Sequence, residues 1–148
     1  MMIQKATELG IQKFIPILSE RSIVRDMNTK RIEKIIVEAS EQSNRISIPK
    51  ILKPESLKIF LQNFPKEGKI IFCDINSNNS ELKNFVSKQN KKNPVCILIG
   101  PEGDFSEKER QSIIDIDQCF SLSIASNILR AETAAIAAIS VVNFYLDS

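Results

Sequence analysis

Histidine is absent from the 148 residues of this chain. Its absence removes the commonest general base and the commonest metal ligand from any mechanism that the chain uses. The three cysteines are isolated from one another, and no C-x-x-C pair indicates zinc or redox chemistry. We therefore expect a protein without a metal site, whose chemistry does not depend on a histidine base.

Long apolar runs are also missing. No apolar segment reaches the length of a membrane-spanning helix, and no signal peptide precedes the first predicted helix. The net charge of +2 does not by itself indicate a nucleic acid or a membrane, and a hydrophobic content of 43% is ordinary for a soluble globular protein. We expect one cytoplasmic domain over residues 1–148, with no membrane partner.

The cysteines fall at a regular interval. Cys73, Cys96 and Cys119 are separated by 23 residues each, and each lies in a predicted strand. This interval fits one strand followed by a crossover helix, which parallel strands require. We interpret the three residues as small buried side chains of adjacent β/α units and not as catalytic thiols.

Predicted strands and helices alternate along the chain. Gly10 is a natural stop for the first helix, and Pro16 indicates an edge or irregular position in the first strand. The predicted strands cover 14–18, 68–74, 95–99 and 120–124, with an extended piece over 48–52 and a polar loop over 76–80. The predicted helices cover 3–9, 29–39, 54–61, 81–89, a segment after Ser106, and 131–146. This alternation predicts an α/β fold with a mostly parallel sheet and helices on both faces.

Two segments in the last third of the chain are the most informative. ILIGPEGDFSEKE begins at Ile97 and SIASNILRAETA begins at Ser123, and each runs from a predicted strand through a loop into a helix. Ser106 and Glu109 form a predicted capping box for the first of these helices. Because parallel strands end at the same edge of a sheet, both loops should lie at the edge where α/β proteins bind ligands.

The first loop favours a particular kind of ligand. Gly100 and Gly103 permit close approach of the backbone, and Pro101 stiffens the loop between them. Neither a P-loop nor a G-x-G-x-x-G pattern is present, and Glu102 would repel phosphate. A neutral or cationic ligand with an apolar body, such as a sulfonium nucleoside, fits better, and a larger side chain at Gly100 should occupy its space. Taken alone, G-P-E-G also fits a plain tight turn.

Four motifs together resemble one family. GPEGDFS, NILRAETA, QKATELG and EASEQSNR resemble the SPOUT-superfamily methyltransferases of RsmE type, in the same order and over nearly the whole chain. Members of this family methylate nitrogen 3 of one uridine in 16S ribosomal RNA with S-adenosylmethionine, releasing S-adenosylhomocysteine. The resemblance implies a SPOUT-type α/β trefoil knot, a homodimer, and the 16S RNA of the small ribosomal subunit as partner.

The resemblance also implies where the cofactor binds, which is in the loops of the knot. Carried over to this sequence, the binding positions are Leu98, Ile99, Gly100, Pro101, Glu102, Gly103, Leu122, Ser123, Ile124, Ala125, Asn127, Ile128, Leu129 and Arg130.

Catalytic and RNA-contacting residues follow from the same resemblance. Arg130 would stabilise the uracil anion, and Glu132 would act as a base or orient the start of the helix. The alternatives are a structural ion pair for Arg130 and a favourable helix-dipole position for Glu132. The segment EASEQSNR would face the RNA, although its spacing alone is more typical of a solvated, salt-bridged helix face. Its candidate contacts are Glu41, Gln42, Asn44 and Arg45.

The chain departs from the family pattern in three places. Asp104 and Ala125 stand where the family usually has glycine, and a backbone that needs positive φ resists alanine. The N-terminal RNA-binding barrel of the family and the first strand of its methyltransferase domain are not found before the QKATELG helix. The barrel would then be supplied by a separately encoded partner, or the chain would be a non-enzymatic relic that keeps the dimer and the cofactor pocket.

Two further alternatives stay open at this point. A SPOUT enzyme that acts on transfer RNA would share the fold and the cofactor, while a phosphate-binding α/β protein is disfavoured by the acidic loop. The predicted last helix is apolar on more than one side, which indicates either a dimer contact or burial within its own domain.

Overall fold

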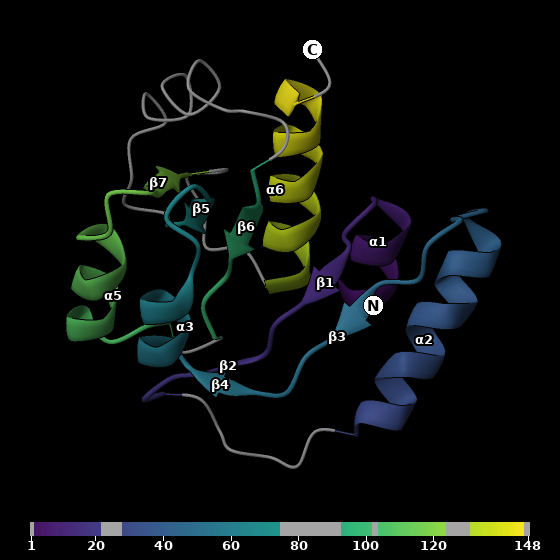
Figure 1. Ribbon diagram of the computed structural model, residues 1–148, viewed down its shortest axis with the longest axis horizontal. Helices are drawn as coiled ribbons and strands as arrows, with labels where there is room; N and C mark the ends of the chain where they lie inside the picture. The colour runs from purple at the N-terminus through teal and green to yellow at the C-terminus, as the bar shows by residue number, and fades with distance from the viewer. Residues whose placement is uncertain (1, 22–27, 75–92, 102–103, 124–130, 147–148) are drawn as a thin grey trace.

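The computed structural model describes residues 2–21, 28–74, 93–101, 104–123 and 131–146 (Figure 1). Helices and short parallel strands alternate in it, as the sequence predicted. In chain order the elements are α1 (Met2–Glu8), β1 (Lys13–Phe14), β2 (Ile17–Leu18), α2 (Thr29–Gln42), β3 (Lys50–Ile51), β4 (Glu55–Ser56), α3 (Leu57–Asn63), β5 (Lys69–Cys73), β6 (Val95–Leu98), α5 (Glu107–Ile114), β7 (Cys119–Leu122) and α6 (Ala131–Leu146).

A three-stranded parallel sheet forms the centre of the molecule, in the order β6-β5-β7. Ile70 and Phe72 of β5 pack in one apolar cluster with α3 and α5. Ile71, which points to the opposite face of the strand, packs in a second cluster with Ala138 and Val142 of α6. The three helices thus lie on the two sides of the strands (Figure 1), and the prediction of helices on both faces is confirmed.

Two smaller parallel pairs, β1 with β3 and β2 with β4, lie beside this centre. Pro16 separates β1 from β2, so the predicted strand over 14–18 is interrupted where proline was expected to disturb it. The predicted start of a helix at Pro54 is wrong. The Glu55 amide donates to the Pro16 carbonyl at 3.1 Å, and the helix begins at Leu57 behind the cap Ser56. A long-range strand contact therefore outweighs the local preference of proline for a helix start.

Helix α1 packs against two other helices, α2 and α6. Ala6 of α1 and Ile36 and Ala39 of α2 are buried. Gly10 ends α1 with φ +100°, and its amide donates to the Thr7 carbonyl at 3.1 Å. This is the left-handed helix stop that the sequence predicted.

Some predicted elements fall outside the described residues, namely the polar loop over 76–80, the helix over 81–89 and the end of the strand at Ile124. In the part of the chain that is described, no helix combines the length and the apolar character needed to cross a membrane.

Candidate functional site

The carboxyl ends of the three central strands meet at one edge of the sheet. Leu98, the last residue of β6, lies beside Phe72, and Leu122, the last residue of β7, lies beside Cys73. The Asp74 amide continues the ladder by donating to the Leu122 carbonyl at 2.9 Å. The loops that follow β6 and β7 therefore leave the sheet from either side of β5, as predicted for a ligand-binding edge.

The loop after β6 makes a tight turn that involves Asp104. Its amide donates to the Pro101 carbonyl at 2.8 Å, and its φ is +63°. Its Oδ1 accepts a hydrogen bond from the Phe105 amide at 2.8 Å. Aspartate is one of the few residues other than glycine that adopt this left-handed conformation. The backbone at this position thus has the left-handed conformation that glycine also adopts readily, and Asp104 adds a carboxylate.

Phe105 fixes the end of this loop to the core. It is buried, and its ring centroid lies 5.9 Å from that of Phe72 in β5. A Cβ on Gly100 would approach Phe105 Cδ2 to 3.2 Å and Asp104 Oδ1 to 3.3 Å. A Cβ at Gly100 would therefore press on Phe105 and Asp104, which would have to give way slightly. The expected loss of ligand space with a larger side chain at Gly100 stays a prediction, and such a side chain would also contact Phe105.

The start of α5 is held by the predicted capping box. Ser106 Oγ accepts from the Glu109 amide at 3.2 Å, and Glu109 Oε1 accepts from the Ser106 amide at 3.1 Å. The other carboxylate oxygen of Glu109 accepts from the Glu20 amide at 3.2 Å. The buried Glu109 therefore joins the end of the loop to the segment after β2, a contact that the sequence did not predict.

The sequence also did not predict an ion pair at the end of β5. Arg110 of α5 donates to Asp74 Oδ2 from Nη2 at 2.6 Å and from Nε at 3.1 Å. The Asp74 side chain is 7% exposed and that of Arg110 28%. The pair ties the end of the central strand to α5 and neutralises a carboxylate at the site. The only signal in the sequence was an aspartate directly after a buried strand.

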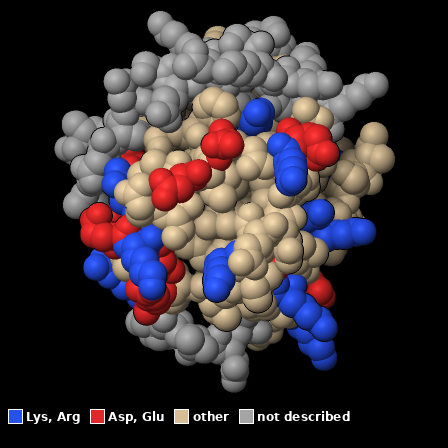
Figure 2. All heavy atoms as spheres, turned by 60° about the vertical axis from the view of Figure 1, so that its left-hand side comes forward, with Lys and Arg blue, Asp and Glu red and all other residues tan. Residues whose placement is uncertain are grey.

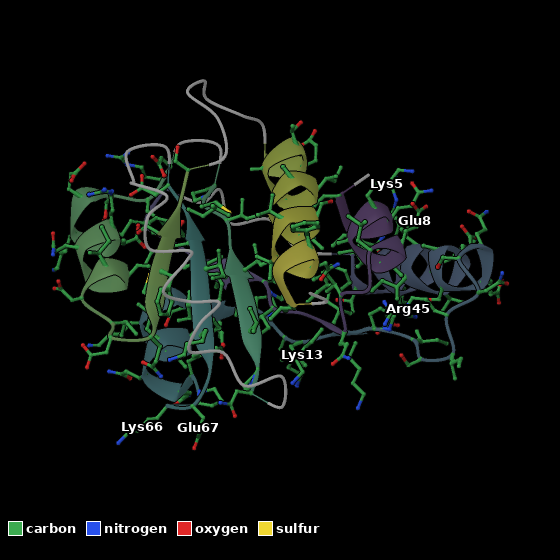
Figure 3. All side chains as sticks on the ribbon, turned by 90° about the horizontal axis from the view of Figure 1, so that it is seen from above. Lys5, Glu8, Lys13, Arg45, Lys66 and Glu67 are labelled. Atoms are coloured by element: carbon green, nitrogen blue, oxygen red, sulfur yellow. The ribbon has the colours of Figure 1, made fainter. Side chains whose placement is uncertain are left out.

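The structure gives Arg45 a partner within its own chain. Glu41, Gln42 and Asn44 at the end of α2 are exposed. Arg45 instead lies between α1 and α2 (Figure 3), where its Nη1 donates to the Thr7 carbonyl at 3.0 Å and to the Ile11 carbonyl at 2.6 Å. Thr7 lies in the last turn of α1 and Ile11 directly follows its Gly10 stop, so the guanidinium lies at the C-terminal end of this helix, where a cation is favourable. Arg45 therefore joins α2 to the end of α1.

Several predicted site residues lie outside the described part of the chain. Glu132 is described and lies, partly buried, in the first turn of α6. The predicted site residues that lie outside the described part of the chain are Glu102, Gly103, Ile124, Ala125, Asn127, Ile128, Leu129 and Arg130.

The cysteines are partly buried, whereas the sequence predicted buried side chains. They occupy β5, β6 and β7, as their spacing predicted. Burial raises the pKa of Cys73 and that of Cys96 to about 12, so both thiols stay protonated near neutral pH. Among the residues that the structure describes, no group of acidic, cysteine or histidine side chains is arranged to hold a metal ion.

A groove of about 600 Å³ lies on the face that carries α3 and α5, and its described lining includes none of the predicted site residues that the structure describes. Leu57 and Leu61 form part of its apolar lining. Figure 2 views this side of the molecule and shows side chains of both charges around an uncharged surface. The charged lining residues are Glu20, Lys58, Lys108 and Glu109. Because two are acidic and two basic, the groove has no field of one sign that would select a charged ligand.

Comparison with known proteins identifies relatives of one kind. The model of the RNA methyltransferase domain family matches residues 1–143. Ribosomal RNA small subunit methyltransferase E of Rickettsia conorii is 36% identical over 140 residues, which cover 93% of this chain and 56% of that protein. The enzyme of the same name from Bacillus subtilis is 33% identical, with coverage of 99% and 60%. The chain thus spans somewhat more than half the length of these relatives.

A solved structure shows the same fold. The crystal structure of ribosomal RNA small subunit methyltransferase E from Neisseria gonorrhoeae, bound to S-adenosyl methionine, superposes with a TM-score of 0.83 at 29% identity. The match covers 97% of this chain and 59% of the Neisseria chain. The family match, these relatives and the parallel α/β architecture lead to one assignment: the chain belongs to the RNA methyltransferase domain family, in its RsmE branch.

Proposed function

We propose that this chain is the methyltransferase domain of an S-adenosylmethionine-dependent enzyme that methylates nitrogen 3 of one uridine in 16S ribosomal RNA. The observation that carries the proposal is the edge formed by β5, β6 and β7, near which Phe105 anchors the end of the loop after β6 in the core. A relative with the same fold binds S-adenosyl methionine, which supports the choice of cofactor.

The described part of this edge fits the cofactor chemically. Leu98 and Leu122, the last residues of β6 and β7, are buried in the apolar clusters on the two faces of the sheet, and the partly exposed residues Ile99 to Pro101 and Ser123 follow them. Asp104 adds a carboxylate, and Asp74 is neutralised by Arg110. An apolar nucleoside with a positively charged sulfur suits these groups better than a phosphate does. The bound cofactor would supply an electrophilic methyl group. The residues proposed to hold it are the fourteen named from the family resemblance.

The protein must then position the uridine and help to remove its proton. Nitrogen 3 of uracil is protonated at neutral pH, so a base or a cation that stabilises the anion is needed. We propose Arg130 as that cation and Glu132 as the base or as an orienter of the α6 start. Glu41, Gln42, Asn44 and Arg45 are proposed to contact RNA, and the first three are exposed at the end of α2. Arg45 also donates to the Thr7 and Ile11 carbonyls, so it would in addition hold this segment in place.

A homodimer is also part of the proposal. Ala138 and Val142 of α6 face the central sheet, and Asn143 donates to the Leu9 carbonyl of α1 at 2.8 Å. Contacts within its own domain thus cover two sides of α6. A further side is exposed, and Phe144 on it is 72% accessible. We propose that this side packs against a second copy, that the chain forms the trefoil knot of the family, and that it acts in the cytoplasm.

The test is transfer of a tritiated methyl group to 16S RNA or to small ribosomal subunits, followed by nucleoside analysis. We expect 3-methyluridine, formed slowly by the chain alone and faster when a barrel domain of a relative is supplied. Arg130→Ala should lower the rate by about 10² to 10³, the usual effect of losing one group that stabilises an anion. Methylation of transfer RNA instead would indicate a different SPOUT substrate. Cofactor binding without methylation in any reconstitution would indicate a non-enzymatic protein.

A further inference from the structure

The carboxylate of Asp104 has a fixed position in the loop after β6. Its Oδ1 accepts from the Phe105 amide at 2.8 Å, and its own amide donates to the Pro101 carbonyl at 2.8 Å. The same oxygen lies 3.3 Å from the position that a Cβ on Gly100 would occupy. The carboxylate is therefore held next to Gly100, at the edge proposed to bind the cofactor.

The charge of this carboxylate is not neutralised within the described residues. The ion pairs found there join Lys5 to Glu8 and Arg110 to Asp74. Of the two cations on α5, Arg110 is occupied by Asp74 and Lys108 lines the groove on the α3–α5 face. Asp104 is exposed, so its carboxylate is open to solvent and to a ligand in this loop.

We infer that Asp104 makes the site select the charged cofactor over its uncharged product. This inference rests on the proposed function. S-adenosylmethionine and S-adenosylhomocysteine share the adenosine and the amino acid groups, and they differ by the methyl group and the positive charge on sulfur. A nearby carboxylate lowers the free energy of the charged form and leaves the thioether nearly unaffected. Asp104 thereby favours cofactor entry and product release.

The size of the effect follows from the exposure of the carboxylate. Water and salt screen an exposed charge pair, so we expect Asp104 to change the ratio of the two dissociation constants by about 2- to 5-fold. A screened interaction also weakens as the ionic strength rises, because the Debye length falls to about 3 Å at 1 M salt.

Substitution by asparagine isolates the charge. Asp104→Asn keeps an oxygen that can accept from the Phe105 amide, and asparagine also tolerates a φ of +63°. Asp115→Asn is the matched control, because Asp115 is an exposed aspartate at the other end of α5. Its Oδ1 likewise accepts a hydrogen bond, from Gln111 Nε2 at 2.7 Å. Circular dichroism verifies that each variant is folded.

The experiment is titration calorimetry of the wild type and both variants with each of the two ligands, at low and high salt. We expect Asp104→Asn to weaken S-adenosylmethionine about 2- to 5-fold, with S-adenosylhomocysteine unchanged, and Asp115→Asn to change neither. High salt should reduce the preference of the wild type and not that of Asp104→Asn. An unchanged ratio in Asp104→Asn, or an equal loss for both ligands, overturns the inference and leaves the proposed function intact. Failure of the wild type to bind either ligand overturns the proposed function, and this inference with it.

Discussion

Two polar motifs of this chain are used in different ways. In the loop after β6, Asp104 and Ser106 bond to neighbouring backbone amides, and Phe105 between them packs against Phe72 of the sheet. At the end of α2, Arg45 crosses to α1 and donates to the carbonyls of Thr7 and Ile11. The first motif organises the segment that carries it, while the charged residue of the second stabilises a different helix. A charged residue in a motif can therefore have a structural contact within its own chain.

The chemistry of the side chains explains the difference. A short acceptor such as aspartate or serine reaches amides one to three residues away and stabilises turns and helix starts. Arginine has a long side chain with several donors, so it reaches carbonyls at and just after the end of another helix. The two regions should then respond separately to mutation, and the following predictions test this.

The largest effect is expected for Phe105→Ala in the first region. It removes a buried ring that contacts Phe72, so the free energy of unfolding should fall by about 3 to 5 kcal/mol. The loop would also lose its attachment to the core, and cofactor binding should weaken. Urea unfolding and calorimetry measure the two effects. Phe105→Leu, which keeps most of the apolar volume, should lose clearly less stability. A loss below about 1 kcal/mol for Phe105→Ala would contradict this view of the loop.

Arg45→Ala tests the second region and should cost about 2 kcal/mol, since hydrogen bonds from a charged group to two carbonyls are lost. Amide exchange should accelerate at Gly10 and Ile11, whose amides close the end of α1. Arg45→Lys should recover only part of the stability, because an ammonium group lacks the fork of donors. Unchanged stability and exchange, together with weaker RNA binding, would show that Arg45 acts on RNA and not on α1.

Ser106→Ala should have a smaller effect, about 1 kcal/mol, through the loss of the α5 cap. Ser106→Thr keeps the hydroxyl and serves as the control. In the double mutant that combines Ser106→Ala with Arg45→Ala, the two losses in the free energy of unfolding should add to within about 0.5 kcal/mol, as expected for independent sites. A larger deviation in the double-mutant cycle would show that the two regions are coupled.

The smallest effect is expected for the alkylation rate of the cysteine thiols in the central sheet. Because burial raises the pKa of Cys73 and Cys96 to about 12, both should alkylate very slowly at pH 8. In the unfolded chain these thiols ionise near 9.0, so their contribution to stability is complete below that pH and is lost as the pH rises toward about 12.

Peptide mass spectrometry after iodoacetamide treatment measures the alkylation of each cysteine. Phe105→Ala should accelerate labelling of Cys96 and Arg45→Ala should not. Equal acceleration by both would contradict the separation of the two regions.

The sequence by itself determined the elements that depend on local patterns. The start of α2 at Asn28, the stop of α1 at Gly10 and the capping box of α5 involve residues at most a few positions apart. The buried strands and their regularly spaced cysteines follow from hydrophobic runs. These signals were enough for the α/β class and for the edge at which two loops meet, and the four motifs identified the family.

Only the tertiary structure decided the contacts between residues that are distant in the chain. Three such contacts join residues that are 34 to 89 positions apart. They are the Asp74–Arg110 ion pair, the hydrogen bond from the Glu20 amide to Glu109, and the hydrogen bond from Arg45 to the Ile11 carbonyl. The same holds for β4, which forms because the Glu55 amide meets the Pro16 carbonyl. No local pattern encodes such pairings, because each depends on which elements the folded chain brings together, and their free energy outweighs the weaker local preferences.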